Sequence, residues 1–256
     1  MLSNYHTHHN RCGHAKGTVE DYVKEAVNQG YDEIGMSCHV PYENFPEMLY
    51  RMKYSEMEAY LTDIKNAQRD YPMISVLTSF ECEYFPHLLN YYKELEQKTD
   101  YLIVAQHKVE VDGQLADAFK FTKPQELEAY AKTLVEAFET KLFQIVAHPD
   151  VFGTMYPTWD ATWEKISRQI IEGAIAHDVI LELNANGFRR GKKKYADGVR
   201  YPYPLEKFWD LVANDYKEAK VMINADCHHP KLLNDEFVKL ARNWASKRHL
   251  NVVTKL

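Results

Sequence analysis

Short, nearly continuous apolar stretches recur along this chain of 256 residues, and between them the apolar residues are spaced as on one face of a helix. Strand and helix are therefore expected to alternate seven times. Apolar strands of this kind are typical of a parallel sheet that is covered on both faces. The alternation predicts an α/β fold whose sheet is closed, or nearly closed, into a barrel. After the opening strand, strands are expected at residues 33–39, 74–81, 101–107, 143–150, 179–184 and 221–228.

The stretches between the strands carry ordinary helix signals. Thr18 and Asp21 are spaced as an N-cap pair, and Gly30 ends the same stretch. A basic loop is expected from Gly187 to Arg200. No repeat, linker or change of composition divides the chain, so residues 1–256 are expected to form a single domain. Helices are expected at residues 18–30, 55–72, 87–97, 122–138, 163–175, 204–209 and 237–244, with a short strand at 249–256.

The charge of the chain limits its partners. There are 31 basic and 37 acidic residues, a formal net charge of -6. This balance argues against nucleic acid as a partner, because binding to a phosphate backbone requires a basic face. No apolar run is long enough to span a bilayer, and no secretory or transit pattern is present. The chain is therefore expected in the cytoplasm, with a small molecule as its partner rather than a membrane or nucleic acid.

Histidines and carboxylates stand at the ends of the predicted strands. His6 and His8 point to the same side if the opening residues are a strand, because side chains alternate with a period of two. Gly13 breaks this run and lets His14 fold back toward them. Because parallel strands share their C-terminal edge, side chains at the strand ends are expected to meet there. The others are His39, Glu81, His107, His148, and Asp226 with His228.

Seven imidazoles and two carboxylates are more than one tetrahedral or octahedral ion can use. The set therefore predicts two or three divalent metal ions, with Glu81 able to bridge two of them. Zinc, manganese and iron all suit these ligands. Mixed nitrogen and oxygen ligands are typical of hydrolytic centres, where the ion lowers the pKa of bound water toward about 7. A phosphoester is the natural substrate of paired ions.

Three arginines in or beside the basic loop are candidates for binding a phosphoryl group. An arginine can hold two phosphate oxygens at once through its fork of N–H donors. Arg189, Arg190 and Arg200 follow the sixth strand, on the same edge as the predicted ligands. The alternative is a solvated basic loop, since three lysines belong to the same run.

The four cysteines form no CxxC pair and no spacing typical of disulfides. Each lies within two residues of a predicted ligand, and direct neighbours on a strand point to opposite faces. They are therefore expected to be small buried residues that pack behind the site rather than thiolate ligands. These residues are Cys12, Cys38, Cys82 and Cys227.

Together these motifs resemble the polymerase-and-histidinol-phosphatase (PHP) superfamily, and within it the stand-alone histidinol-phosphate phosphatases. They span nearly the whole chain in the order of the family, which usually has an aspartate where this chain has Cys38. The motifs are His6-Thr7-His8, Cys12-Gly13-His14-Ala15, Ser37-Cys38-His39, Glu81, Gln106-His107, Ala147-His148-Pro149-Asp150, Asn186-Gly187-Phe188-Arg189 and Asn224-Ala225-Asp226-Cys227-His228.

The resemblance implies a distorted seven-stranded, TIM-like barrel that carries three metal ions. A hydroxide that bridges the first two ions would attack phosphorus. Asp226, His228 and Arg189 are the expected catalytic residues, and Arg189 matches the phosphate-binding arginine of the family. The ligand sets implied for the three ions are, in turn, His6, His8, Glu81 and Asp226; Glu81, His107 and His148; and His14, His39 and His228.

The same resemblance implies a phosphomonoesterase that converts L-histidinol phosphate to L-histidinol and phosphate in histidine biosynthesis. Candidates for the pocket that holds its ammonium and imidazole are Tyr42, Phe45, Glu110 and Tyr156. Three alternatives stay open. A PHP-type nuclease or nucleotide phosphodiesterase is disfavoured for long nucleic acids by the acidic charge. An amidohydrolase would usually have a lysine or carboxylate where this chain has His107. A metal-loaded module without turnover would not need the complete set of predicted ligands.

Overall fold

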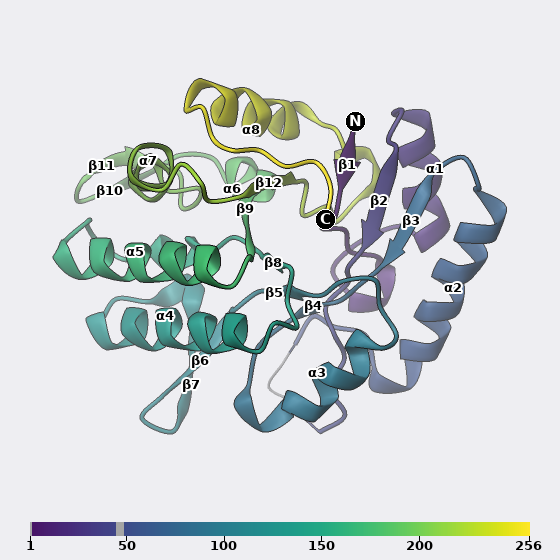
Figure 1. Ribbon diagram of the computed structural model, residues 1–256, viewed down its shortest axis with the longest axis horizontal. Helices are drawn as coiled ribbons and strands as arrows, with labels where there is room; N and C mark the ends of the chain where they lie inside the picture. Colours follow the sequence, from purple (N-terminus) through teal and green to yellow (C-terminus); the bar gives the residue numbers. More distant parts are fainter. Residues whose placement is uncertain (1, 45–48) are drawn as a thin grey trace.

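The computed structural model describes residues 2–44 and 49–256. Its parallel strands lie in a three-stranded sheet of order β1-β2-β3 and a five-stranded sheet of order β12-β9-β8-β5-β4. Helices pack around the outside of the strands (Figure 1). The α/β class and the parallel sheet predicted from the sequence are confirmed. The strands are β1 (Ser3–Asn4), β2 (Glu33–Met36), β3 (Ser75–Thr78), β4 (Glu81–Cys82), β5 (Ile103–Val104), β8 (Ile145–Val146), β9 (Ile180–Asn184) and β12 (Val221–Asn224).

Bridges join both edge strands of the five-stranded sheet, β12 and β4, to the three-stranded sheet. Thr7, beyond β1, pairs with Cys227, beyond β12. His39, beyond β2, pairs with Glu81 at the start of β4. The backbone N–H of His8 also donates to the carbonyl oxygen of Cys227 at 3.0 Å. Strands from the two ends of the chain are therefore held together next to the predicted ligands.

Helices connect most successive parallel strands, as the apolar spacing predicts. The first begins with a capping box, in which the side chains of Thr18 and Asp21 each accept from the backbone N–H of the other. In the part of the chain that the structure describes, no helix is both long and apolar enough to cross a membrane. The helices are α1 (Val19–Asn28), α2 (Met57–Asp70), α3 (Leu89–Glu96), α4 (Pro124–Glu139), α5 (Ala161–Ala176), α6 (Ala185–Arg189), α7 (Glu206–Asp215) and α8 (Glu236–Lys247), with a 3-10 turn η1 at Asn10–Cys12.

Two antiparallel hairpins depart from the sequence prediction. One pairs β6 (Lys108–Val111) with β7 (Gln114–Asp117), and the other pairs β10 (Lys193–Tyr195) with β11 (Gly198–Arg200). The prediction of a basic loop from Gly187 to Arg200 is therefore wrong, because α6 and the second hairpin occupy most of this segment. The predicted strand over 74–81 is interrupted between β3 and β4. The tail forms one bridge, from Val252 to Val221, instead of a strand.

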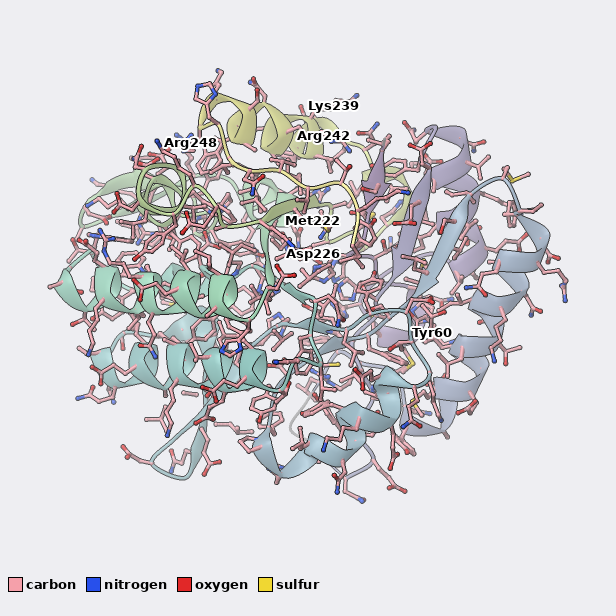
Figure 2. All side chains as sticks on the ribbon, viewed as in Figure 1. Tyr60, Met222, Asp226, Lys239, Arg242 and Arg248 are labelled. Atoms are coloured by element: carbon pink, nitrogen blue, oxygen red, sulfur yellow. The ribbon has the colours of Figure 1, made fainter. Side chains whose placement is uncertain are left out.

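Apolar side chains bury both faces of the five-stranded sheet. Leu102 and Val104 belong to the large core under the helices, whereas Ile103 between them belongs to a second cluster. In that cluster, the rings of Tyr5 and Tyr101 lie 5.7 Å apart and connect β1 with the other sheet. Figure 2 shows Met222, a member of the second cluster, near Asp226 in the middle of the molecule. The predicted ligands thus stand on a rigid, doubly covered sheet.

Candidate metal centre

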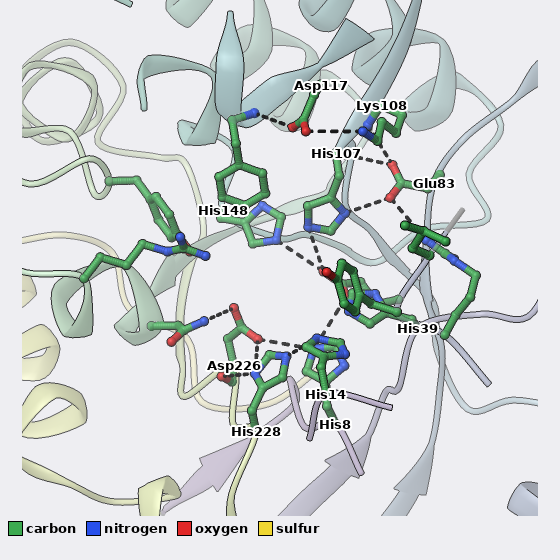
Figure 3. Close-up of a pocket in the computed structure, with 18 of the residues that line it drawn as sticks. His8, His14, His39, Glu83, His107, Lys108, Asp117, His148, Asp226 and His228 are labelled. Carbon is green, nitrogen blue, oxygen red and sulfur yellow. Dashed lines mark hydrogen bonds and ion pairs between the residues drawn. The ribbon is translucent and has the colours of Figure 1, made fainter. Parts of the chain in front are cut away.

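The predicted ligands meet around one cavity of about 690 Å³ at the C-terminal edge of the parallel strands (Figure 3). Eight of the nine line this cavity, and the ninth, His6, is fully buried beside them. The structure therefore brings together residues that are widely separated in the sequence. Three overlapping groups can be distinguished by their distances.

His6, His8, Glu81 and Asp226 form the most deeply buried group. The Nε2 atoms of His6 and His8 lie 3.1 Å apart. Both nitrogens lie within 3.7 Å of carboxylate oxygens of Glu81 and Asp226. Ligand atoms at about 2.1 Å from an ion are separated by about 3.0–3.4 Å in octahedral or tetrahedral coordination. The observed separations therefore fit a shared metal ion.

Glu81 is common to the first and second groups. Five imidazoles lie within 3.8 Å of its carboxylate oxygens. Among these, His148 Nε2 lies 3.2 Å and His107 Nε2 lies 3.8 Å from Glu81 Oε1, close enough to hold an ion together. Glu83 Oε1 lies 2.7 Å from His107 Nδ1. This contact fixes the ring and directs its Nε2 to the cavity.

The third group is more exposed and contains imidazoles from four segments. His14 Nε2 and His228 Nε2 lie 2.9 Å apart. The rings of His8 and His228 stack with their centroids 4.2 Å apart. Nitrogens of His8, His39 and His228 also lie within 4.8 Å of one another. The structure therefore places the set that the resemblance implies, His14, His39 and His228, together and adds His8 to it.

His148 and Asp226 have backbone conformations that are rare for residues other than glycine. Their φ angles are 31° and 44°. Each lies two residues beyond the end of a strand, His148 after β8 and Asp226 after β12. Such a conformation costs about 1–3 kcal/mol and persists where the surrounding structure enforces it. The strain falls on two predicted metal ligands, which is the kind of position where strain accompanies function.

Charges in the centre oppose the effect of burial. Burial lowers the pKa of His6, but nearby carboxylates, first among them Glu182, outweigh it and raise the pKa well above its ordinary value. Burial raises the pKa of Glu81, but the imidazoles of His39 and His6 hold it well below its usual range. The pKa of His8 is lowered by burial and by neighbouring imidazoles. The centre thus favours ionised carboxylates, which attract a cation.

A buried carboxylate that the sequence prediction missed lies behind the first group. Glu182 Oε1 lies 2.8 Å from His6 Nδ1 and accepts from Asn224 Nδ2 at 3.0 Å. Its Oε2 accepts from the backbone N–H of His148 at 3.1 Å and from Asn184 Nδ2 at 2.8 Å. Glu182 therefore holds His6 by Nδ1 and leaves Nε2 for an ion. The available sequence signal was the alternation of side chains along β9, which places Glu182 on the same face as Asn184 at the end of the strand.

Glu182→Gln is expected to weaken metal binding by about 10–100-fold, the usual effect of removing a carboxylate that orients a ligating histidine. The amide keeps the shape but loses the charge that supports His6. Competition with a coloured chelator measures the affinity. The exposed Glu218→Gln variant is the matched control. An unchanged affinity in folded Glu182→Gln protein would contradict the assigned role.

Residues 4–186 match the family model described as "PHP domain", and this range contains every candidate ligand except Asp226 and His228. The chain belongs to the PHP family. The family resemblance predicted from the sequence motifs is confirmed.

Two curated relatives are similar to this PHP protein over most of their length. A Schizosaccharomyces pombe protein is 24% identical in an alignment 278 residues long. The alignment covers 94% of this chain and 85% of the relative. A Deinococcus radiodurans protein is 24% identical over 248 residues, which cover 90% of this chain and 87% of the relative. Both carry the name "Probable histidinol-phosphatase".

Two solved structures share the fold of this PHP protein. One, from Listeria monocytogenes, has a TM-score of 0.75 and 17% identity, and the match covers 93% of this chain and 99% of that one. The other, from Lactococcus lactis, has a TM-score of 0.73 and 17% identity, with 98% and 95% covered. The Lactococcus protein is a histidinol phosphate phosphatase complexed with zinc, L-histidinol and phosphate.

Of the three arginines predicted to bind phosphate in this PHP protein, only Arg190 lines the cavity. Arg189 donates to both carboxylate oxygens of Asp235, at 2.8 and 3.1 Å, and to the carbonyl oxygen of Ala225. Arg200 donates to backbone carbonyl oxygens outside the cavity. The phosphate-binding roles predicted for Arg189 and Arg200 do not fit these positions, because protein acceptors already hold their N–H groups.

The residues suggested for the ammonium and imidazole of the substrate also need correction. Phe45 lies outside the described residues. Tyr42, Glu110 and Tyr156 do not line the cavity. Much of the wall comes instead from the first hairpin and the residues that follow it, which the apolar pattern did not reveal. The lining residues that the prediction missed are Leu49, Tyr50, Arg51, Glu83, Lys108, Asp117, Phe119, Lys120, Asn186 and Tyr203.

Proposed function

We propose that this PHP protein is a metal-dependent phosphomonoesterase that hydrolyses L-histidinol phosphate to L-histidinol and phosphate in histidine biosynthesis. The observation that carries the proposal is the meeting of nine imidazole and carboxylate groups around a cavity that also contains Arg190. The substrate is supported by the names of the two curated relatives, which match nearly the whole chain. The proposal carries with it a cytoplasmic location.

The three groups of ligands suit two or three divalent ions, zinc, manganese or iron, with Glu81 shared between the first two groups. When bound, such ions lower the pKa of water to supply a nucleophile and stabilise charge on phosphoryl oxygens. The protein holds the ligands in place for this chemistry. Asn186 Nδ2, for example, donates to Asp226 Oδ2 at 3.2 Å. Asp226 and His228 act in catalysis as ligands at the cavity wall.

Arg190 is the proposed phosphate-binding residue. Its guanidinium lies over the rings of Phe119 and Tyr203, 4.9 and 5.3 Å from their centroids. Its Nε donates to the hydroxyl of Tyr203 at 3.0 Å. These contacts fix the guanidinium in the cavity wall through its faces and one edge. The terminal N–H donors can then hold two phosphate oxygens.

Arg190→Ala is expected to lower kcat/KM by about 10–100-fold, because hydrogen bonds to a charged group contribute about 1.5–3 kcal/mol. Initial rates of phosphate release over a range of substrate concentrations measure the effect. Lys194→Ala removes an exposed cation from the same segment and is expected to leave the rates unchanged. Equal kinetics for the Arg190→Ala and Lys194→Ala variants would reject the phosphate-binding role.

The fold proposed for this activity is a distorted seven-stranded, TIM-like barrel in which residues 1–256 form one catalytic domain. β3 and β4 count as one strand, since only two residues separate them. The bridges from Thr7 to Cys227 and from His39 to Glu81 support closure, because each joins an edge of one sheet to the other. The ligands would then stand around one end of the barrel, where such folds place their chemistry.

The proposed activity is tested by measuring phosphate released from L-histidinol phosphate by the metal-loaded protein. Turnover is expected for the wild type and not for His8→Ala, whichever metal is added. p-Nitrophenyl phosphate and a phosphodiester serve as comparison substrates. Equal turnover of unrelated phosphomonoesters would remove the claim on the substrate. Cleavage of the diester or of an oligonucleotide, without release of phosphate from histidinol phosphate, would favour a nuclease or phosphodiesterase.

A further inference from the structure

Two buried thiols meet behind the metal centre. Cys12, at the end of η1, and Cys38, beyond β2, are both buried. Each points its Sγ at the same acceptor, the carbonyl oxygen of His9, at 3.0 Å for Cys12 and 3.9 Å for Cys38. Two sulfur atoms from separate segments are therefore brought to one point. Cys82 and Cys227 are buried as predicted but do not belong to this group.

His8 adds a nitrogen to this pair. The donor atoms of His8, Cys12 and Cys38 all lie within 4.8 Å of one another. His8 Nε2 lies 3.2 Å from Asp226 in the first group. Its Nδ1 is also buried and has no hydrogen-bond partner among the described residues. A buried polar nitrogen without a partner destabilises the folded chain, so a ligand at this position would be stabilising.

We propose that Cys12, Cys38 and His8 form a further metal site that takes a thiophilic divalent ion such as zinc or cadmium. Zinc binds sulfur at about 2.3 Å and imidazole nitrogen at about 2.0 Å, so an ion would draw the three donors inward. The carbonyl oxygen of His9 is available as a fourth donor. Binding displaces the two thiol protons and the proton of His8 Nδ1 to solvent.

The proposed site differs chemically from the catalytic groups, whose donors are nitrogen and oxygen alone. Soft ions prefer thiolate ligands, whereas manganese prefers carboxylate and water. A protein supplied with both kinds of ion would therefore place the softer ion at Cys12 and Cys38. This division would occur whether or not the phosphatase proposal is correct, because it depends only on the donors of the thiol site.

Cobalt(II) is a suitable probe, because thiolate ligation produces a near-ultraviolet charge-transfer band that nitrogen and oxygen ligands do not. We expect the band when cobalt is added to the reduced, chelator-treated full chain. The Cys12→Ser, Cys38→Ser double variant should lack the band. The Cys82→Ser variant, which changes a buried cysteine outside this group, should retain the band. No band in the wild type at saturating cobalt, or a band that survives in the double variant, would overturn the proposal.

The single Cys38→Ser variant provides a second test that disturbs packing less than the double variant, because it replaces one buried sulfur by oxygen and adds no charge. One of two thiolates remains, so the band is expected at about half its intensity, with an unchanged circular dichroism spectrum. A band of full intensity would reject the assignment of Cys38 even if the double variant did not fold. Phosphate release is measured separately on manganese-loaded protein, so failure of the thiol site and failure of the phosphatase proposal give different results.

Discussion

Glu81→Gln is expected to reduce kcat/KM for L-histidinol phosphate by about 10³-fold or more, equivalent to about 4 kcal/mol of transition-state stabilisation. The carboxylate lies within 3.8 Å of five imidazoles and is the proposed link between the first and second ions. An amide of the same shape supplies one neutral oxygen in place of two that share a charge. The affinity for both ions should therefore fall together.

The Glu81→Gln prediction needs a count of bound metal as well as a rate. Elemental analysis after dialysis is expected to show at least one ion fewer per chain than in the wild type. Glu110→Gln, an exposed change on β6, controls for the general effect of removing one charge. Retention of both wild-type metal content and wild-type turnover by Glu81→Gln would show that this carboxylate does not bridge ions.

Removal of metal by a chelator is expected to abolish turnover and to lower the melting temperature. An ion present at about 100 times its dissociation constant stabilises the folded chain by about 2.7 kcal/mol. For a chain of this size that corresponds to a fall of about 5–10 °C when the ion is removed. The Nε2 atoms of His6 and His8, 3.1 Å apart, are placed to share such an ion.

Differential scanning calorimetry and phosphate release test this expectation. Each is measured before chelation, after chelation, and again after addition of zinc, manganese or iron. At least one of the ions should restore both quantities together. Full turnover in protein whose metal content is below one ion per ten chains would contradict a metal-dependent mechanism. The His8→Ala variant, which lacks a ligand of the first group, should show a smaller fall in melting temperature on chelation.

Much of the fold was accessible from sequence because the parallel strands are buried on both faces. Such strands form continuous apolar runs, and the helices between them show helical spacing. The hairpins were missed because β6, β7, β10 and β11 are only three or four residues long and half of their residues are polar or charged. A local signal did exist for the first, since the dipeptide Asp112-Gly113 favours a two-residue hairpin turn. In the structure both residues have positive φ angles, 51° and 75°.

The candidate ligands could be predicted because they follow a positional rule, at the C-terminal edge of parallel strands. Arg189 obeyed the same rule, yet its partner Asp235 lies in a later segment, and no local pattern reveals that pairing. Glu182 was not predicted because it lies inside an apolar strand rather than at the end of one. Long-range pairing and buried charge are decided by tertiary packing, which a pattern along the chain does not encode.

The bridge between Thr7 and Cys227 has a consequence for synthesis in the cell. Asp226 lies 218 residues after His8 and therefore leaves the ribosome later, and domains generally fold as units. A partly translated polypeptide can bind ions through its leading histidines but cannot enclose them. Hydrolytic activity should therefore appear only when β12 packs beside β1. A truncated chain that ends before β12 should have no activity.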